Sequence, residues 1–281
     1  MFQLLDYTNL PMRKYSVLMT VFKEDNPLFV KASIDSMLNQ TIPTDDFVIV
    51  FDGELTDDLI NLIDDYQNKY SSVFNIIHLT NNVGLGSALH DGLIYCKNEL
   101  VARMDDDDVS RPDRCEKEII AFENDENLDI CGSYVSEFDV DPLTPIRIKT
   151  VPLTHEEIVK FSKRRNPFNH SSVMFKKTSI INVGNYSSMR TNQDVELWVR
   201  CLNSGLHGIN IDSPLVDFRF DAKTYKRRKQ WKNVKLLIKT WRSFKKKKYC
   251  SFLDYFHVLS TQLAIFILPT CFIKWAYNHL R

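Results

Sequence analysis

The stretch RMDDDDVSRPDR, residues 103–114, carries four consecutive aspartates directly behind an apolar run. Adjacent ionised carboxylates repel one another, so such a run is unfavourable unless a cation offsets the charge. Carboxylate oxygens suit Mg²⁺ or Mn²⁺, and Mg²⁺ in proteins commonly shares its coordination between one or two carboxylates and the phosphates of a substrate. The run therefore indicates a metal-assisted phosphate site, with a solvated acidic loop as the alternative.

Two further stretches could complete a pocket for a nucleoside diphosphate. Asp52 is followed by Gly53, which permits a close backbone approach, so the Asp52 carboxylate could accept a hydrogen bond from a base N–H or a ribose hydroxyl. Gly84 and Gly86 precede a helical pattern and could expose backbone N–H groups. The structural alternatives at these two places are an ordinary Asp-Gly turn and a helix-entry turn.

Short apolar runs alternate with helical patterns along the first hundred residues. The first helix is expected to begin at Asn26, a favourable N-cap, with Pro27 at the first helical position. Alternation of this kind predicts an α/β fold with a parallel sheet covered by helices on both faces. The expected strands are 15–22, 47–51, 73–79 and 99–104, and the expected helices between them are 26–40, 56–70 and 86–98.

The candidate residues fall at the ends of these predicted strands. Thr20, Asp52, Gly84 and the aspartate run each follow or close a strand. In parallel sheets, ligands bind beyond the carboxyl ends of the strands. We therefore expect four separate loops to converge on one edge of the sheet, which argues against a merely solvated acidic loop.

The chain resembles the inverting family 2 glycosyltransferases with the GT-A fold, in the branch that makes bacterial capsule, exopolysaccharide and O-antigen. The resemblance covers roughly residues 14–220 and implies a Rossmann-like, mostly parallel sheet flanked by helices. It implies a catalytic domain of residues 1–220, with the nucleotide sugar bound by roughly 14–115 and the acceptor by roughly 116–220. The motifs that carry it are SVLMTVF, DSMLNQT, VFDGELTD, NNVGLGSALHDGL, VARMDDDDVSRPDR, NHSSVMFKK, VGNY and NQDVELWVR.

The resemblance also implies roles for single residues. Asp105 and Asp107 take the places of the two acids of the D-x-D motif, with Asp107 as the foremost ligand of Mn²⁺ or Mg²⁺. Asp52 would accept from the uracil N3–H of a UDP-sugar, and Asp194 matches the catalytic base. The expected nucleotide-binding residues are Thr20, Phe22, Asp52, Gly84, Asp105 and Asp106.

Transfer of a sugar with inversion requires a general base on the side of the acceptor hydroxyl. Asp194 begins a helical pattern that ends at Gly205, and the helix dipole there favours an ionised carboxylate. A plain helix N-cap is the structural alternative. His170, Arg111 and Arg114 are candidates for the acceptor or phosphate side. Their alternatives are a core or loop histidine and, for Arg114, an ion pair with the acidic loop.

The formal net charge of zero conceals a basic C-terminal segment, because Asp254 is the only acid after residue 221. Residues 226–248 interleave Lys and Arg with aromatic and aliphatic residues, whereas 255–273 contain no formal charge but include Pro269. We expect a helical tail, residues 221–281, that lies on the headgroups of an anionic membrane. A basic face packed on the catalytic domain is the alternative. Nucleic acid is not expected, because the acidic pocket would repel its phosphates.

The six cysteines include no C-x-x-C pair, so neither a zinc site nor a disulfide framework is predicted. No pattern of a secretory signal opens the sequence, and we expect a cytoplasmic protein, peripheral on the inner face of the cell membrane.

The expected function is that of a metal-dependent glycosyltransferase, a hexosyltransferase that adds a sugar to a polyprenyl-diphosphate-linked saccharide. One alternative is a nucleotidyltransferase that makes activated sugars, but the stretch MTVFKEDNP lacks the glycine-rich basic loop that this chemistry would require. The other is a non-catalytic cation-binding module with a membrane anchor.

Overall fold

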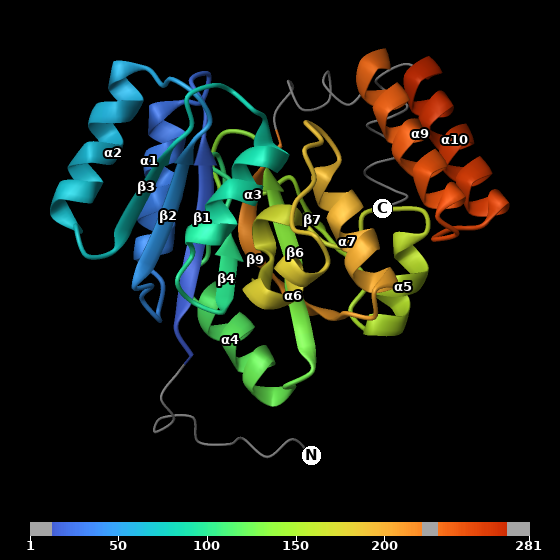
Figure 1. The fold of residues 1–281 in the computed structure, drawn as a ribbon, viewed down its shortest axis with the longest axis horizontal. Helices are drawn as coiled ribbons and strands as arrows, with labels where there is room; N and C mark the ends of the chain where they lie inside the picture. Colours follow the sequence, from blue (N-terminus) through green and yellow to red (C-terminus); the bar gives the residue numbers. More distant parts are fainter. Residues whose placement is uncertain (1–12, 221–229, 269–281) are drawn as a thin grey trace.

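The computed structural model describes residues 13–220 and 230–268, which form one mixed sheet with helices on both faces and a helical hairpin at one end (Figure 1). The nine-stranded sheet has the order β3-β2-β1-β4-β8-β6-β9-β5, with β7 paired to β6. The strands are β1 Tyr15–Val21, β2 Asp46–Phe51, β3 Phe74–His78, β4 Leu100–Arg103, β5 Val109–Ser110, β6 Leu128–Phe138, β7 Arg147–Lys149, β8 Met174–Lys176 and β9 His207–Arg219. The helices are α1 Pro27–Leu38, α2 Asp57–Lys69, α3 Leu85–Tyr95, α4 Arg114–Asn124, α5 His155–Ser162, the 3₁₀ turn η2 His170–Ser172, α6 Lys177–Asn182, α7 Gln193–Asn203, α9 Trp231–Lys246 and α10 Phe252–Ile267.

The predicted α/β fold class is confirmed by the first half of the chain. Strands β3, β2, β1 and β4 are parallel neighbours, joined by α1, α2 and α3. Helix α1 begins as predicted, because the Asn26 side chain accepts a 3.0 Å hydrogen bond from the Leu28 N–H and Pro27 occupies the first turn.

The second half makes the sheet mixed rather than parallel throughout. Strand β8 enters between β4 and β6 and is antiparallel to both, whereas β6 and β9 form a long parallel pair. Strand β5 pairs antiparallel with β9, and β7 pairs antiparallel with β6. The prediction of a parallel sheet therefore holds for β1 to β4. The other half of the sheet contains antiparallel pairs that the alternation of strand and helix patterns does not predict.

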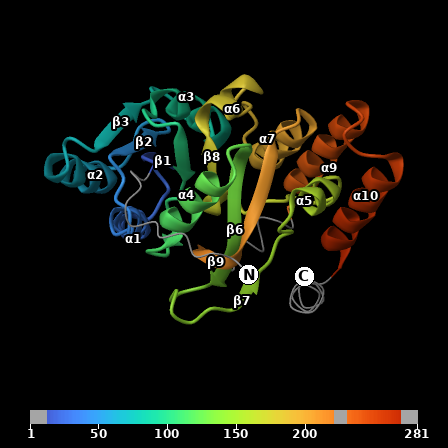
Figure 2. The same cartoon turned by 90° about the horizontal axis from the view of Figure 1, so that it is seen from below.

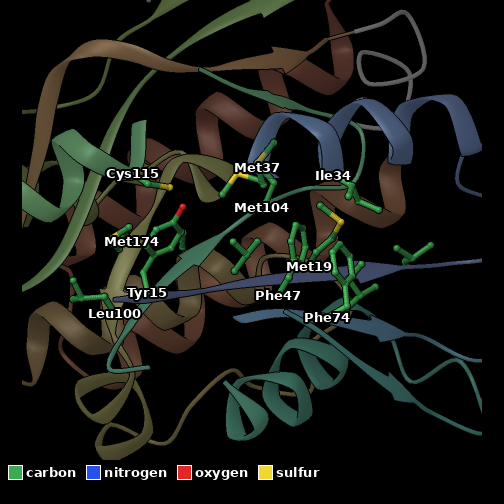
Figure 3. Packing of buried hydrophobic residues seen from close by; sticks show 14 of the residues in the cluster. Tyr15, Met19, Ile34, Met37, Phe47, Phe74, Leu100, Met104, Cys115 and Met174 are labelled. Carbon is green, nitrogen blue, oxygen red and sulfur yellow. The ribbon is translucent and has the colours of Figure 1, made fainter. Parts of the chain in front are cut away.

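The alternation of side chains along β1 divides the core into two layers. Val17 and Met19 pack with α1, α2 and α4 on one face, while Leu18 packs with α3 and α7 on the other. Figure 3 shows the first layer, where Met19 lies among Ile34, Met37, Phe47 and Phe74. Because both faces are covered, the polar residues at the strand ends are held on a rigid frame.

The C-terminal segment forms a hairpin of α9 and α10 that lies beside α5 and α7 at one end of the molecule (Figures 1 and 2). Val195 and Val199 of α7 pack against Trp241, Phe244 and Val258 of the hairpin. The described part of the tail thus packs on α7 through its apolar residues rather than through a basic face, and its binding to a membrane stays a prediction.

Two polar contacts reinforce this packing. The Trp241 indole N–H donates a 3.0 Å hydrogen bond to the Lys163 carbonyl, and Arg164 pairs with Asp254 at 2.6 Å. Parts of the two tail stretches singled out in the sequence, 226–229 and 269–273, lie outside the described residues. Within 13–220 and 230–268, no helix has the length and apolar character needed to cross a bilayer.

Candidate active site

A cavity of about 1040 Å³ lies at the carboxyl ends of the parallel strands and extends to the hairpin. The convergence of loops expected from the strand ends is present, because side chains that follow β1, β2 and β4 all line this cavity. The predicted site residues that line it are Thr20, Phe22, Asp52, Gly84, Asp105, Asp106, Asp107, His170 and Asp194.

Asp52 fastens the loop between β3 and α3. Its buried carboxylate accepts hydrogen bonds from the N–H groups of Val83 at 2.7 Å and Gly84 at 3.0 Å, and from the Asn82 side chain at 2.9 Å. Gly53 beside it has a φ of +89°, and a Cβ there would lie 2.7 Å from the Asn82 backbone nitrogen. The Asp-Gly pair is therefore needed for the turn itself, and three donors occupy the Asp52 carboxylate in this structure.

The four aspartates of the acidic run lie in four different environments. Asp105 forms an ion pair with the buried Arg103, and Asp107 is exposed. Asp106 shares a hydrogen bond with the Asp25 carboxyl group. Asp108 is fully buried, accepts a 2.8 Å hydrogen bond from the Arg219 N–H and does not line the cavity.

These environments explain how the chain tolerates four acids in a row. Burial, followed by the nearby Asp25, raises the pKa of Asp106 well above its ordinary value, which favours one shared proton between the two groups. Arg103 offsets the charge of Asp105, and solvent screens Asp107. The run is thus a structured part of the cavity wall.

The donor set fits a Mg²⁺ or Mn²⁺ ion that is completed by phosphate oxygens. Among the residues that the structure describes, no group of three or more His, Cys, Asp or Glu side chains could by itself hold a metal. A phosphate-bridged ion requires only one or two carboxylates from the protein. Asp107 and Asp105, which both line the cavity, meet that requirement.

Asp194 lies at the second position of α7, not at its N-cap, which is Asn192 in a left-handed conformation with φ 60°. The plain N-cap alternative is therefore wrong. The Asp194 carboxylate accepts a 2.6 Å hydrogen bond from the Asn166 side chain. It lies in the cavity on the side of the hairpin, where it could receive a proton from a bound hydroxyl group.

The protonation of Asp194 differs from what its helix position suggests. Burial raises the pKa of the carboxyl group, although the N–H groups of Val195 and Asp194 and the charges of Arg103 and Lys149 act in the opposite direction. The helix terminus does favour the anion as expected, but desolvation outweighs it. A raised pKa is typical of carboxylates that serve as general bases.

His170 is a neutral member of the cavity wall. Its Nε2 lies 3.1 Å from the Tyr186 hydroxyl, and its ring contacts the edge of Trp198. Burial, reinforced by the charge of Arg103, lowers the pKa of His170 well below its ordinary value. It therefore combines the two interpretations left open by the sequence, since it is a hydrogen-bonded histidine and also faces the cavity.

Arg111 and Arg114 are not brought to the cavity. Arg111 pairs with Asp217 at 3.0 Å and so joins β5 to β9. Arg114 is fully buried, pairs with Glu118 at 3.2 Å and donates to the Arg103 carbonyl at 2.8 Å. Both arginines stabilise the frame below the acidic run, and neither is placed to contact a diphosphate in this arrangement.

Several residues that line the cavity or support its wall were missed by reasoning from the sequence. Arg103 is only 1% exposed, and an arginine inside the apolar run ELVARM was a signal that a buried acid must lie nearby. Arg190 donates a 2.7 Å hydrogen bond to the Asn82 side chain and thereby links the loop before α7 to the loop held by Asp52. No local pattern marks Asn166, whose role depends on its contact with Asp194.

Comparison with known proteins agrees with this geometry. The model of the family "Glycosyl transferase family 2" matches residues 16–186. The chain is 36% identical over 265 residues to the UDP-Gal:alpha-D-GlcNAc-diphosphoundecaprenol beta-1,3-galactosyltransferase of Escherichia coli, covering 94% of this chain and 95% of the relative. It is 32% identical over 228 residues to the amylovoran biosynthesis glycosyltransferase AmsE of Erwinia amylovora, covering 81% of this chain and 84% of the relative.

Among solved structures, the mannosyltransferase PcManGT of Pyrobaculum calidifontis, in complex with GDP-Man and Mn²⁺, superimposes with a TM-score of 0.64 at 13% identity, covering 90% of this chain and 70% of that one. This likeness supports the GT-A fold of the sheet and its flanking helices. With the family match over residues 16–186 and the identity to the E. coli enzyme, the chain is a glycosyltransferase and belongs to glycosyl transferase family 2.

Proposed function

We propose that this enzyme transfers a sugar from a UDP-sugar to a saccharide carried on a polyprenyl diphosphate, with inversion at the anomeric carbon. The observation that carries the proposal is the division of one cavity into two chemically different ends. Asp52 and the acidic run line one part of it, and Asp194, which feels the charges of both Arg103 and Lys149, lines another. The E. coli relative, whose name specifies a UDP-sugar donor and a lipid-diphosphate acceptor, supports this assignment.

Asp194 is the group that would act as the general base. Its anionic carboxylate would take the proton of the acceptor hydroxyl as that oxygen attacks the anomeric carbon. Asn166 keeps the carboxylate in place through its 2.6 Å hydrogen bond. A single displacement with the base opposite the leaving group requires inversion.

The acidic end is suited to the donor diphosphate only with a cation present. Asp107 and Asp105 would hold Mn²⁺ or Mg²⁺, which would act as a Lewis acid and stabilise the charge of the leaving diphosphate. Arg103, buried behind Asp105, offsets part of the negative charge of the run. The structural likeness to PcManGT, which was solved with GDP-Man and Mn²⁺, supports this proposal.

The test is transfer by the purified full-length chain with Mn²⁺, a panel of UDP-sugars and a synthetic α-GlcNAc-diphospholipid. We expect one donor to give a glycosylated lipid whose new linkage, determined by NMR, has the inverted configuration. A product that retains the donor configuration would contradict the mechanism. Release of pyrophosphate from a nucleoside triphosphate and a sugar phosphate would instead support a nucleotidyltransferase, and no turnover with any donor would support a binding module.

We also propose that the hairpin attaches the enzyme to the inner face of the cell membrane. Phe252, Leu253 and Phe256 of α10 are 60%, 72% and 56% exposed. Lys245 lies over the Phe252 ring at 4.6 Å, so basic and apolar groups occupy the same surface. Such a combination is typical of helices that lie on anionic lipid headgroups.

A further inference from the structure

Near Asp194, the cavity also contains side chains whose charge is opposite to that of the acidic run. Three cationic side chains, Lys149, Arg164 and Arg165, line this part. Beyond them the cavity is bounded by the α9–α10 hairpin, through apolar residues that include Leu237, Trp241, Val258, Ile265 and Leu268. A cationic patch next to an apolar wall matches a ligand with an anionic group attached to a hydrocarbon.

We propose that Lys149, Arg164 and Arg165 bind the diphosphate of the acceptor lipid and that the α9–α10 wall binds the first part of its hydrocarbon chain. The inference rests on the proposed function, since it assigns a place to the lipid diphosphate of that acceptor. It adds a second diphosphate subsite, which uses arginine and lysine, to the donor subsite at the acidic run.

The charges of the cavity separate the two diphosphates. The donor end carries four carboxyl groups, those of Asp25, Asp105, Asp106 and Asp107, which a diphosphate would meet directly unless a metal ion lay between them. Arg190 and Arg219 also line the cavity and offset part of this charge. The acceptor end carries the three cations, and guanidinium groups bind phosphate oxygens with paired hydrogen bonds. A lipid diphosphate therefore binds at the acceptor end without a divalent cation, whereas the nucleotide does not bind well at the donor end without one.

Arg164 ties the cationic patch to the hairpin. Its side chain pairs with Asp254 at 2.6 Å, and the Asp254 carboxylate is itself held by the Ser251 hydroxyl at 2.7 Å. Arg165, the next residue, lies over the Phe161 ring at 5.8 Å. The first turn of α10 thus fixes the position of the patch relative to the apolar wall.

The wall leads from the patch to the apolar surface of the protein. Val258, Ile265 and Leu268 are separated by seven and three residues, so they lie on one face of α10 or directly after its end. At 1.5 Å per residue, the span from 258 to 268 is about 15 Å. Ile267 and Leu268, at its far end, are 74% and 44% exposed.

The same side of the hairpin offers polar groups as well. His257, Thr261 and Gln262 of α10 line the cavity beside the apolar residues. These groups can hydrogen-bond to a saccharide or a phosphate while the apolar residues contact the hydrocarbon. The wall is therefore amphipathic along its length, as the junction of a lipid and its headgroup requires.

A binding experiment with geranylgeranyl diphosphate tests the subsite. The titration uses the full-length chain in EDTA, which removes any cation that could hold a diphosphate at the acidic end, and follows the fluorescence of the tryptophans or the heat of binding. We expect geranylgeranyl diphosphate to bind more tightly than either geranylgeraniol or inorganic pyrophosphate. Equal affinities for the diphosphate and the alcohol would overturn the proposal.

Matched variants assign the two halves of the ligand. Arg165→Ala and Lys149→Ala should each weaken the binding of geranylgeranyl diphosphate about tenfold, as expected for loss of a charged hydrogen bond. Neither variant should change the affinity for geranylgeraniol. Lys163→Ala removes the same charge from an exposed neighbour that does not line the cavity and should change nothing. An equal loss in the Lys163 variant would show that general surface charge, not the subsite, binds the ligand.

To test the contact with the hydrocarbon, Ile265→Gln should weaken the binding of geranylgeranyl diphosphate but not the binding of pyrophosphate. Ile267→Gln, two residues away and outside the cavity lining, is its control. If the two variants behave alike, the wall does not bind the chain.

Transfer kinetics separate this inference from the proposed function. If wild-type enzyme glycosylates a lipid diphosphate, Arg165→Ala should raise KM for that acceptor and leave KM for the donor unchanged. Unchanged acceptor KM in a working transfer assay would overturn the subsite and leave the proposed function intact. Failure of wild-type transfer, with the binding differences retained, would overturn the proposed function and leave the lipid-diphosphate subsite.

Discussion

Asn166 donates a 2.6 Å hydrogen bond to Asp194, across 28 residues of sequence. The contact joins the loop after α5 to the first turn of α7 and fixes one oxygen of the proposed base. An amide donor stabilises the anion more than the neutral acid, so the contact also helps to keep the carboxyl group ionised despite its burial. Position and protonation of Asp194 thus depend on the same neighbour.

The variant Asp194→Asn should lower kcat by about 10²–10⁴, because the amide cannot accept the proton of the acceptor hydroxyl. Donor affinity should change little, since Asp194 is not among the residues proposed to hold the nucleotide or its metal ion. Steady-state kinetics together with nucleotide titration check both parts. Loss of donor affinity equal to the loss of kcat would place Asp194 in the donor site.

Activity should fall on the acid side at a higher pH than an ordinary aspartate would give. Burial raises the pKa of Asp194, and the protonated form cannot act as a base, so kcat/KM declines as the pH drops through this raised pKa. Asn166→Ala should move the acid limb further upward, because it removes a donor to the anion. If kcat/KM falls at the same acidic pH in the wild-type enzyme and in the Asn166→Ala variant, this role of Asn166 is contradicted.

Replacement of Asp107 should remove metal-dependent binding without unfolding the chain. Its side chain is exposed in the cavity, and its loss relieves repulsion within the acidic run. We expect Asp107→Ala to abolish transfer and the increase in Tm that UDP gives with Mn²⁺. Glu24→Ala, which removes an exposed acid outside the cavity lining, should keep both properties. Full activity of the Asp107 variant, or of wild type in excess EDTA, would exclude the metal role.

The α9–α10 hairpin should contribute to the stability of the fold. Trp241 is 3% exposed, packs against the α7 valines and donates to the Lys163 carbonyl. We expect Trp241→Ala to lower the free energy of unfolding by about 3–5 kcal/mol in urea titrations. Trp231→Ala, on the same helix but 41% exposed, should cost less than about 1.5 kcal/mol. A loss for Trp241→Ala as small as that for Trp231→Ala would show that the hairpin is not an integral part of the fold.

Membrane binding should depend on both salt and the exposed face of α10. We expect the full-length chain to sediment with vesicles that contain anionic lipid and to be released as salt rises, because basic residues near such a surface contribute on the order of 1 kcal/mol each before screening. Replacing the 72% exposed Leu253 by Asp should weaken sedimentation without changing Tm. Attachment that resists salt and requires detergent for release would contradict a peripheral mode.

The sequence was sufficient for the parts of the site that follow from strand ends. Thr20, Asp52 and the acidic run close buried parallel strands, and the geometry of such sheets brings them together. It was not sufficient for β8, which pairs with β4 from more than 70 residues away and makes half of the sheet mixed. The alternation of strand and helix patterns does not show that a later strand inserts antiparallel between two earlier ones.

The remaining misses depend on contacts between distant residues. The pKa of Asp194 was expected to follow its helix terminus, but burial by the surrounding cavity dominates. Glu118 lies one helical turn after Arg114, and this spacing was a local hint of their ion pair. The pair holds the Arg114 side chain away from the cavity. No comparable hint marks the pairing of Arg164 with Asp254, which joins segments 90 residues apart.

The packing of the hairpin on α7 limits how this enzyme can be re-engineered. Val195 follows Asp194 directly, and its side chain contacts the hydrophobic cluster of α9 and α10. A chimera that grafts another enzyme's C-terminal helices onto this chain would therefore place a foreign surface one residue from the proposed base. Helices α9 and α10 are not an exchangeable module, and a workable graft has to include the matching face of α7.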